Sequence, residues 1–306
     1  MRLGLLTACL PGEPLDAIAG WAAGHGYRGL EVAAWPREPD RPWQASHLDV
    51  DRFDAAEADR VRALLDGHGL SVSAVAYYEN NLHADPATRE RIHRHLRRCV
   101  DAAALLGCEH VGTFVGRDVT RTVTENLRLG EEVLPPLVAY AADRGVRLVV
   151  ENCPMEGWHP DGYPANLAYS PELWDWLGGL GLFLNFDPSH LVWLGIDPIA
   201  ALTGHLDLVR HVQAKDVQVD AAARNRFGVF GQLVGKPSPW TSGWWRYRVP
   251  GLGEVDWRRL VDVLYEGGYR GFVSVEHEDP VWSGSPERVR QGLVIAERTL
   301  GPLLVA

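Results

Sequence analysis

Short apolar runs alternate along the chain with longer segments in which apolar residues recur at helical spacing. The first pattern predicts β-strands buried on both faces, and the second predicts amphipathic α-helices. Eight such strand and helix pairs follow one another at a spacing of roughly 38 residues, as a (β/α)8 barrel of ordinary length requires. The predicted strands lie at 2–7, 29–33, 70–78, 109–115, 148–151, 182–187, 209–214 and 271–275.

Most of the predicted helix starts share one chemistry, a short polar residue followed by proline. The polar side chain caps the first free backbone N–H groups, and proline at the first helical position has no N–H to satisfy. Another helix is predicted from Asp51, and Pro135-Pro136 must kink or restart the helical pattern of 123–141. The capped starts are Asp85-Pro86, Ser170-Pro171, Asp197-Pro198 and Ser285-Pro286.

The sequence gives no sign of separate domains, since no linker or low-complexity segment interrupts the pattern. We therefore predict one α/β domain, a TIM barrel over residues 1–306 with long loops after some strands; the alternative is a doubly wound sheet with an appendage. Two loops, 34–50 and 218–253, are too long to be mere connections, and they are rich in aromatic residues, including Trp35 and Trp43. Both follow a strand, so in a barrel both lie at the catalytic face.

Composition narrows the class of protein. The chain has 46% hydrophobic residues, enough for a large core, and a net charge of −10, so nucleic acid is a poor partner. No signal peptide and no apolar run of about 18 residues can be read, which argues against a membrane. The four cysteines lack metal-site spacing, so we expect reduced thiols and a cytoplasmic protein.

Carboxylates stand at the ends of three predicted strands. Glu151, Asp187 and Glu276 would converge on one mouth of the barrel, where three carboxylates without a cation repel one another. A divalent metal resolves this conflict, and oxygen ligands favour Mn²⁺ or Mg²⁺, with Co²⁺ or Zn²⁺ as alternatives. The competing interpretation is that each acid forms an ion pair with a basic residue such as Lys215 or Arg147.

Five motifs give the chain a family resemblance. In order they are Glu-Asn at 151–152, Asp-Pro-Ser-His at 187–190, His-x-x-x-Lys-Asp at 211–216, Pro-Gly-x-Gly-Glu-x-Asp-Trp at 250–257 and Ser-Val-Glu-His-Glu-Asp at 274–279. With them the chain resembles the sugar phosphate isomerase/epimerase family, the xylose isomerase-like barrels that include inosose dehydratase, hydroxypyruvate isomerase and ketose 3-epimerases. The motifs are specific for the superfamily and much less specific for the reaction.

The resemblance implies a divalent metal held by Glu151, Asp187, Glu276 and one residue of the seventh strand, with His190 beside the substrate. In the family that fourth ligand is usually a histidine, whereas this chain has Gln213. An amide oxygen is a weaker donor than imidazole, which shifts the preference further toward Mn²⁺ or Mg²⁺. The departure also leaves open a weakened site.

The reaction expected from the resemblance is isomerisation or epimerisation of a sugar or keto-sugar. The metal polarises a bound carbonyl, and Glu151 and Glu276 move a proton at the neighbouring carbon through an enediolate. A lyase or dehydratase, acting on an inosose-like cyclitol or a 3-keto-glycoside, would use the same first step. A non-catalytic sugar-binding subunit is a further alternative, and an apurinic endonuclease is disfavoured by the acidic charge.

Further residues are candidates for substrate binding. Lys215 would face the mouth and either orient a carboxylate or substrate, or form a structural ion pair. The chain has twelve tryptophans, and those in mouth loops would stack on a sugar or aglycone, or else bury an interface of the homo-oligomer that we expect. The remaining substrate-binding candidates are Trp35, His159, Trp193 and Trp245.

Overall fold

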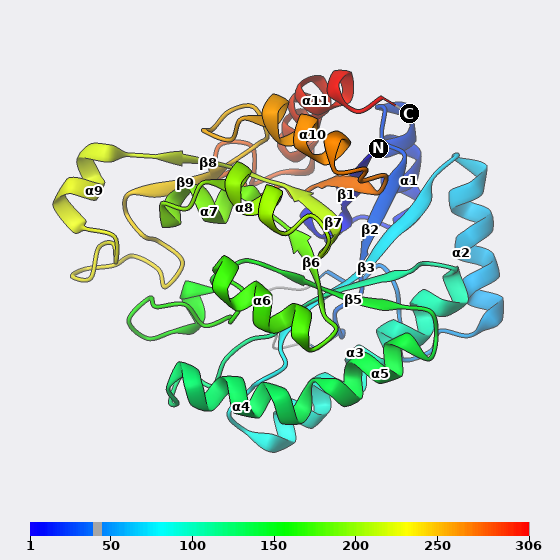
Figure 1. Cartoon of the computed structure of the whole chain (residues 1–306). Helices are drawn as coiled ribbons and strands as arrows, with labels where there is room; N and C mark the ends of the chain where they lie inside the picture. Colours follow the sequence, from blue (N-terminus) through cyan, green and yellow to red (C-terminus); the bar gives the residue numbers. More distant parts are fainter. Residues whose placement is uncertain (39–44, 306) are drawn as a thin grey trace.

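Eight parallel strands close into a barrel in the computed structural model, which describes residues 1–38 and 45–305 (Figure 1). Their order around the barrel is β1-β10-β7-β6-β5-β4-β3-β2, so the predicted TIM barrel is confirmed. The predicted Trp43 lies outside the described residues. The barrel strands are β1 (Arg2–Leu6), β2 (Gly29–Ala33), β3 (Ser71–Asn80), β4 (His110–Phe114), β5 (Arg147–Glu151), β6 (Phe183–Phe186), β7 (Val209–Ala214) and β10 (Phe272–Val275).

Helices follow the strands and cover the outside of the barrel. Asp85, Asp197 and Ser285 cap their helices as predicted, and the helical pattern restarts at Pro135. Ser170 stands before Pro171 at the start of α6 as predicted, but its side chain makes no cap hydrogen bond. One predicted start is wrong: α2 begins after the cap Asp54 rather than at Asp51, because Asp54 accepts the N–H of Glu57. The helices are α1 (Leu15–Gly24), α2 (Ala55–Gly67), α3 (Pro86–Leu106), α4 (Val123–Val133), α5 (Pro135–Ala142), α6 (Pro171–Gly179), α7 (Pro188–Leu194), α8 (Pro198–Gly204), α9 (Ala221–Phe227), α10 (Trp257–Glu266) and α11 (Pro286–Leu300).

The predicted loop 218–253 contains regular structure. A hairpin of β8 (Asp216–Val219) and β9 (Trp245–Arg248) leaves the barrel directly after β7, with Val217 opposite Tyr247 in antiparallel register. Between the two strands lie α9 and an extended segment, which project away from the barrel at the left of Figure 1. We call residues 221–243 the arm.

The core lies inside the barrel and between the strands and the helices, and most barrel-strand residues are buried. Strand register stacks the interior side chains in layers. Glu151 on β5 pairs with Asn185 on β6, which in turn pairs with His211 on β7. Within the described residues, no helix is long and apolar enough to cross a membrane, and the four cysteines are free thiols.

Candidate active site

Three carboxylates meet where β5, β6 and β10 end. Glu151 is the last residue of β5, Asp187 follows β6, and Glu276 follows β10. One oxygen from each lies within 4.8 Å of the others, as in a site for a metal ion. Glu151 and Asp187 are buried, and the side chain of Glu276 is only 12% exposed. The predicted convergence of the strand ends is therefore what the fold produces.

Local sequence explains why two of these strand ends lie so close together. The side chain of Asn152 donates to the carbonyl oxygen of Asp187 at 2.8 Å, and the Asp187 N–H donates to the Asn152 side chain at 2.7 Å. Asp187 also caps α7 by accepting the Ser189 N–H at 2.8 Å, and Pro188 occupies the first helical position. The Glu-Asn and Asp-Pro-Ser-His motifs are thus joined by two hydrogen bonds between the Asn152 side chain and the Asp187 backbone.

Lys215 supplies a positive charge to the cluster. Its ammonium nitrogen lies 2.8 Å from Glu276, 3.2 Å from Asp187 and 3.8 Å from Glu151, and 3.1 Å from the more exposed Glu278. Lys215 is buried, and its nitrogen also lies 4.5 Å from the ring centre of Tyr247. Four carboxylates around one ammonium leave the group with excess negative charge.

His190 bridges the carboxylates to the hairpin. Its Nε2 lies 3.0 Å from Glu151 and 3.2 Å from Asp187, while its Nδ1 lies 3.0 Å from the hydroxyl of Tyr247. All ring nitrogens of this buried histidine therefore have partners. The imidazole is held in one orientation by a residue of β9 on one side and by the acidic cluster on the other.

The surroundings of Asp187 and Glu276 shift the pKa values of these two carboxyl groups in opposite directions. Burial opposes ionisation of Asp187, but Lys215 and His190 outweigh it and lower the pKa to about 2. Burial and the charge of Glu151 raise the pKa of Glu276 well above its usual value. Burial also opposes the charge of Lys215, yet the surrounding carboxylates raise its pKa. Two carboxyl groups with separated pKa values suit one permanent anion and one proton carrier.

Gln213 lies in the barrel interior beside a buried acid that the sequence did not single out. Its amide nitrogen donates to Glu31 and to the Tyr78 hydroxyl, both at 3.1 Å, and Tyr78 donates to the same Glu31 oxygen. The Gln213 amide oxygen and the second Glu31 oxygen are buried without a hydrogen-bond partner among the described residues. Burial raises the pKa of Glu31 to about 8.

This donor set fits a divalent cation. The three clustered carboxylates supply hard oxygen ligands, and Asp187 keeps one buried oxygen without a hydrogen bond in the described structure. The amide oxygen of Gln213 is likewise a free acceptor, since its nitrogen is taken by Glu31 and Tyr78. Excess negative charge around Lys215 points to the same class of ligand.

The sequence model of the xylose isomerase-like TIM barrel matches residues 19–297, which is most of the chain. The chain belongs to this family. Protein YfiH of Bacillus subtilis is 28% identical over 91% of this chain and 93% of its own. Inosose dehydratase of Clostridium beijerinckii is 32% identical over 32% of each chain. The family resemblance read from the motifs is confirmed.

Solved structures of other proteins share the fold. A zinc-bound IolI protein has a TM-score of 0.69 at 18% identity, covering 99% of this chain and 98% of its own. D-psicose 3-epimerase of Clostridium cellulolyticum, solved with D-tagatose, has a TM-score of 0.67 at 14% identity and covers both chains fully. At such identities these structures establish the fold alone.

The predicted tryptophans lie in two places, two of them beside Tyr247 and one beside Tyr78. Trp193 stacks on Trp245 with ring centres 4.6 Å apart, and Trp245 lies 4.7 Å from Tyr247, which bonds His190. Trp35 lies 5.9 Å from the ring of Tyr78, the hydroxyl of which contacts Gln213. Trp245 and Trp35 are therefore one residue removed from the polar cluster, and Trp193 is two residues removed.

Unlike the other predicted site residues, His159 has no described contact that leads to the carboxylate cluster. It contacts Tyr163 of its own loop at 5.1 Å between ring centres, and its Nδ1 accepts the Asp161 N–H. It is partly exposed, and none of its described contacts involves the carboxylate cluster.

Glu31 and Tyr247 are site residues that the sequence interpretation missed. Glu31 sits inside an apolar run, and a carboxylate in the middle of a buried strand is itself a signal of an interior polar site. Tyr247 lay in a segment interpreted as loop, so nothing in the sequence paired it with His190. Only the hairpin register brings it there.

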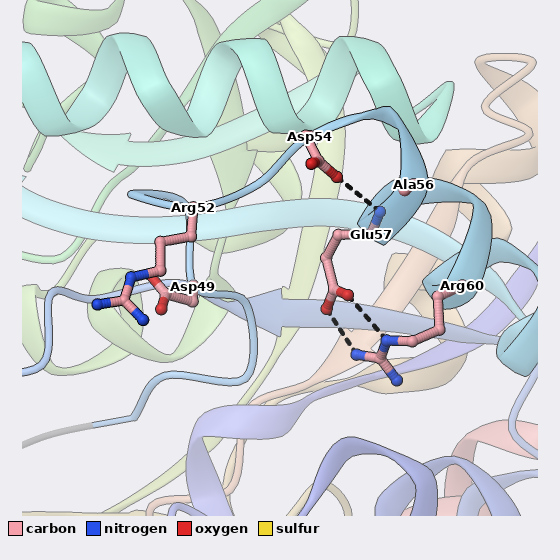
Figure 2. A pocket seen from close by; sticks show the side chains of 6 residues that line it. All are labelled: Asp49, Arg52, Asp54, Ala56, Glu57 and Arg60. Atoms are coloured by element: carbon pink, nitrogen blue, oxygen red, sulfur yellow. Dashed lines mark hydrogen bonds and ion pairs between the residues drawn. The ribbon is translucent and has the colours of Figure 1, made fainter.

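Two surface hollows lie apart from the cluster. One of about 480 Å³ surrounds the start of α2, where Glu57 pairs with Arg60 and Asp54 caps the helix (Figure 2). A second of about 740 Å³ lies between the loops that follow β1 and β2. Neither is lined by Glu151, Asp187 or Glu276, so the chemistry belongs to the strand ends.

Proposed function

We propose that the protein is a divalent-metal-dependent isomerase or epimerase that moves a proton beside the carbonyl of a sugar or keto-sugar. The observation that carries the proposal is the buried meeting of Glu151, Asp187 and Glu276 around the Lys215 ammonium. Membership of the xylose isomerase-like family supports the same class of reaction.

Glu151, Asp187 and Glu276, with the amide oxygen of Gln213, are the residues that would hold the metal, with Mn²⁺ or Mg²⁺ favoured. When bound, the cation supplies charge that stabilises negative charge developing on a substrate oxygen. The identity of the metal is predicted from the oxygen ligands alone.

The proton is moved by the chain's own carboxyl groups. Glu276 in its ionised form takes the proton from the carbon next to the carbonyl, and because burial raises its pKa above the usual value, its carboxylate is a stronger base than an exposed one. Glu151, on a strand across the mouth, returns a proton from the other side. Asp187 stays ionised, and Lys215 holds Glu276 in place at 2.8 Å.

A lyase or dehydratase is the second candidate, and the local matches to inosose dehydratases favour it. It would begin with the same proton removal and then expel a substituent from the adjacent carbon. His190 is the group placed to protonate a leaving group, since nearby acids, Asp187 among them, outweigh burial and raise its pKa.

The deciding experiment follows proton exchange in D₂O by NMR, with Mn²⁺ or Mg²⁺, across keto-sugars, inososes and 3-keto-glycosides. Exchange with a new sugar supports the isomerase or epimerase, whereas exchange followed by loss of water or aglycone supports the lyase. Metal and sugar binding without exchange would instead support the sugar-binding subunit.

Substitution tests the roles of the two acids. Glu276→Gln and Glu151→Gln should each slow exchange by about a hundredfold or more while the fold is kept, because a general base is removed. Glu278→Gln is the matched control, since Glu278 also contacts Lys215 but is 47% exposed, and it should lose less than about tenfold. Full exchange in Glu276→Gln would refute its assignment as the base.

The remaining partners follow from the same proposal. A small carbohydrate is the substrate expected for this family, and free thiols suit a cytoplasmic location. We also propose that the protein is a homo-oligomer.

A further inference from the structure

The arm exposes an unusual amount of apolar surface. Among the residues that the structure describes, nine large apolar side chains are exposed, and five of them lie on the arm. Their exposed fractions run from 51% for Trp240 to 88% for Val234. Clustered rather than scattered apolar exposure marks an interaction surface. The other three members are Val229, Phe230 and Leu233.

The charge of the arm is opposite to that of the rest of the chain. The arm has three cations, Arg224, Arg226 and Lys236, and no acid. Since the whole chain has a net charge of −10, the remainder has a net charge of −13. Within the described residues no ion pair joins these cations to an acid. The arm therefore carries both apolar surface and uncompensated positive charge.

The arm is held in place by contacts with the segment between β5 and α6. A Cβ atom on Gly157 would lie 2.2 Å from the Trp240 ring, so the ring rests directly on that backbone. The ring of Phe230 meets that of Tyr163 at 5.3 Å. A surface that is already ordered loses less conformational entropy on binding than a flexible one.

We propose that the arm is an interface between two copies of this chain, with the arm of each copy on the acidic body of the other. Pairing of arm with arm would bring like charges together, whereas arm on body joins opposite charges. An anionic membrane is disfavoured because it would repel a body of charge −13.

The available area suits a reciprocal pair. Exposed side chains of this size offer on the order of 100 Å² each, so one arm offers on the order of 500 Å² of apolar surface. Two arms related by a two-fold axis reach about 1,000 Å², the lower bound for a specific interface. The polar rims of both contacts would add to this area.

Lysine chemistry gives a direct test, because the chain has only two lysines, Lys215 and Lys236, and Lys215 is buried. A zero-length carbodiimide cross-linker joins lysines to carboxylates. Applied to a mixture of ¹⁴N- and ¹⁵N-labelled full-length protein, it should give mixed-isotope peptides that link Lys236 to an acid of the body. Links confined to single-isotope pairs would overturn the proposal.

Sedimentation of a matched pair of variants gives an independent measurement. Leu233→Glu should weaken self-association at least about tenfold, while Leu105→Glu, the same change at an exposed site on α3, should leave it unchanged. Raising the salt concentration should weaken association of the wild type. A wild type that is monomeric at tens of micromolar, a Leu233→Glu variant that associates normally, or a monomer that binds phosphatidylserine vesicles would each refute the proposal.

Discussion

Gln213 is the position where this chain departs most clearly from the family pattern, and its surroundings determine which atom of its amide is free. Glu31 and Tyr78 both take up the amide nitrogen, which fixes the flip of the side chain and leaves the oxygen as the free atom. An amide held in this way keeps one buried acceptor free, as the proposed ligation of a cation requires. The family histidine would offer a nitrogen and a different metal preference.

Gln213→His should therefore tighten metal binding and shift the preference toward Zn²⁺, by about tenfold relative to Mn²⁺. Calorimetric titration of the metal-free protein with each cation measures both quantities. Unchanged affinity and preference would argue against ligation by residue 213.

Glu31 makes the stability of the protein depend on pH. Its pKa is raised from 4.5 to about 8, chiefly by burial, so the folded chain binds this proton more tightly than the unfolded chain. The resulting stabilisation is complete below pH 4.5 and is lost as the pH rises through 8.

Glu31→Gln removes that dependence. The unfolding free energy of the variant minus that of the wild type should increase by on the order of 3 to 5 kcal/mol when the pH is raised from 5 to 9. Urea unfolding in EDTA at the two pH values measures the difference. The exposed Glu132→Gln should show none, and an equal pH response in both variants would exclude a buried, protonated Glu31.

At the scale of elements, the β8–β9 hairpin joins the barrel mouth to the surface. Its register places Tyr247 against His190 and Lys215, while its far end leads into the arm. Movement of the hairpin would therefore reach the imidazole directly.

Tyr247→Phe keeps the ring over Lys215 but removes the hydroxyl that bonds His190. We expect kcat to fall about tenfold with KM nearly unchanged, because the imidazole loses one of its two anchors. Steady-state kinetics on the substrate found by the exchange experiment measures the split. Tyr265→Phe, which loses a hydroxyl contact to the Val305 backbone, is the control, and equal kcat in both would assign Tyr247 a packing role.

Sequence patterns predicted the barrel strands well and the hairpin poorly, for a physical reason. Barrel strands are buried on both faces and read as apolar runs, whereas β9 is half-buried and reads as Trp-Arg-Tyr-Arg. The helix α7 was missed because it is only seven residues long, from Pro188 to Leu194, and ends at Gly195. Asp187 and His190 were found because strand ends fix their place, but the Tyr247 contact depends on tertiary register.

At the scale of the whole molecule, strand ends from distant parts of the sequence are brought together with like charges. Glu151 and Glu276 are 125 positions apart in the sequence numbering and approach within 4.8 Å. A cation bound there would stabilise the closed barrel against unfolding, because the unfolded chain scatters its ligands.

Removal of metal should therefore lower thermal stability. Adding Mn²⁺ at about a hundred times its dissociation constant to EDTA-treated protein should raise the Tm by about 5 °C. Differential scanning calorimetry measures the shift. Asp187→Asn, which can still cap α7, should lose the response, and a Tm that ignores metal in the wild type would count against a bound cation.

The stacked tryptophans have a spectroscopic consequence. Trp193 and Trp245 lie nearly parallel, with an interplanar angle of 12°, and reach the imidazole through Tyr247. At a ring-centre distance of 4.6 Å the two indoles are close enough for their electronic transitions to couple, so we expect a paired band of opposite signs in circular dichroism. A sugar that enters beside His190 should perturb that band, so occupancy of the mouth can be followed optically in the unlabelled protein.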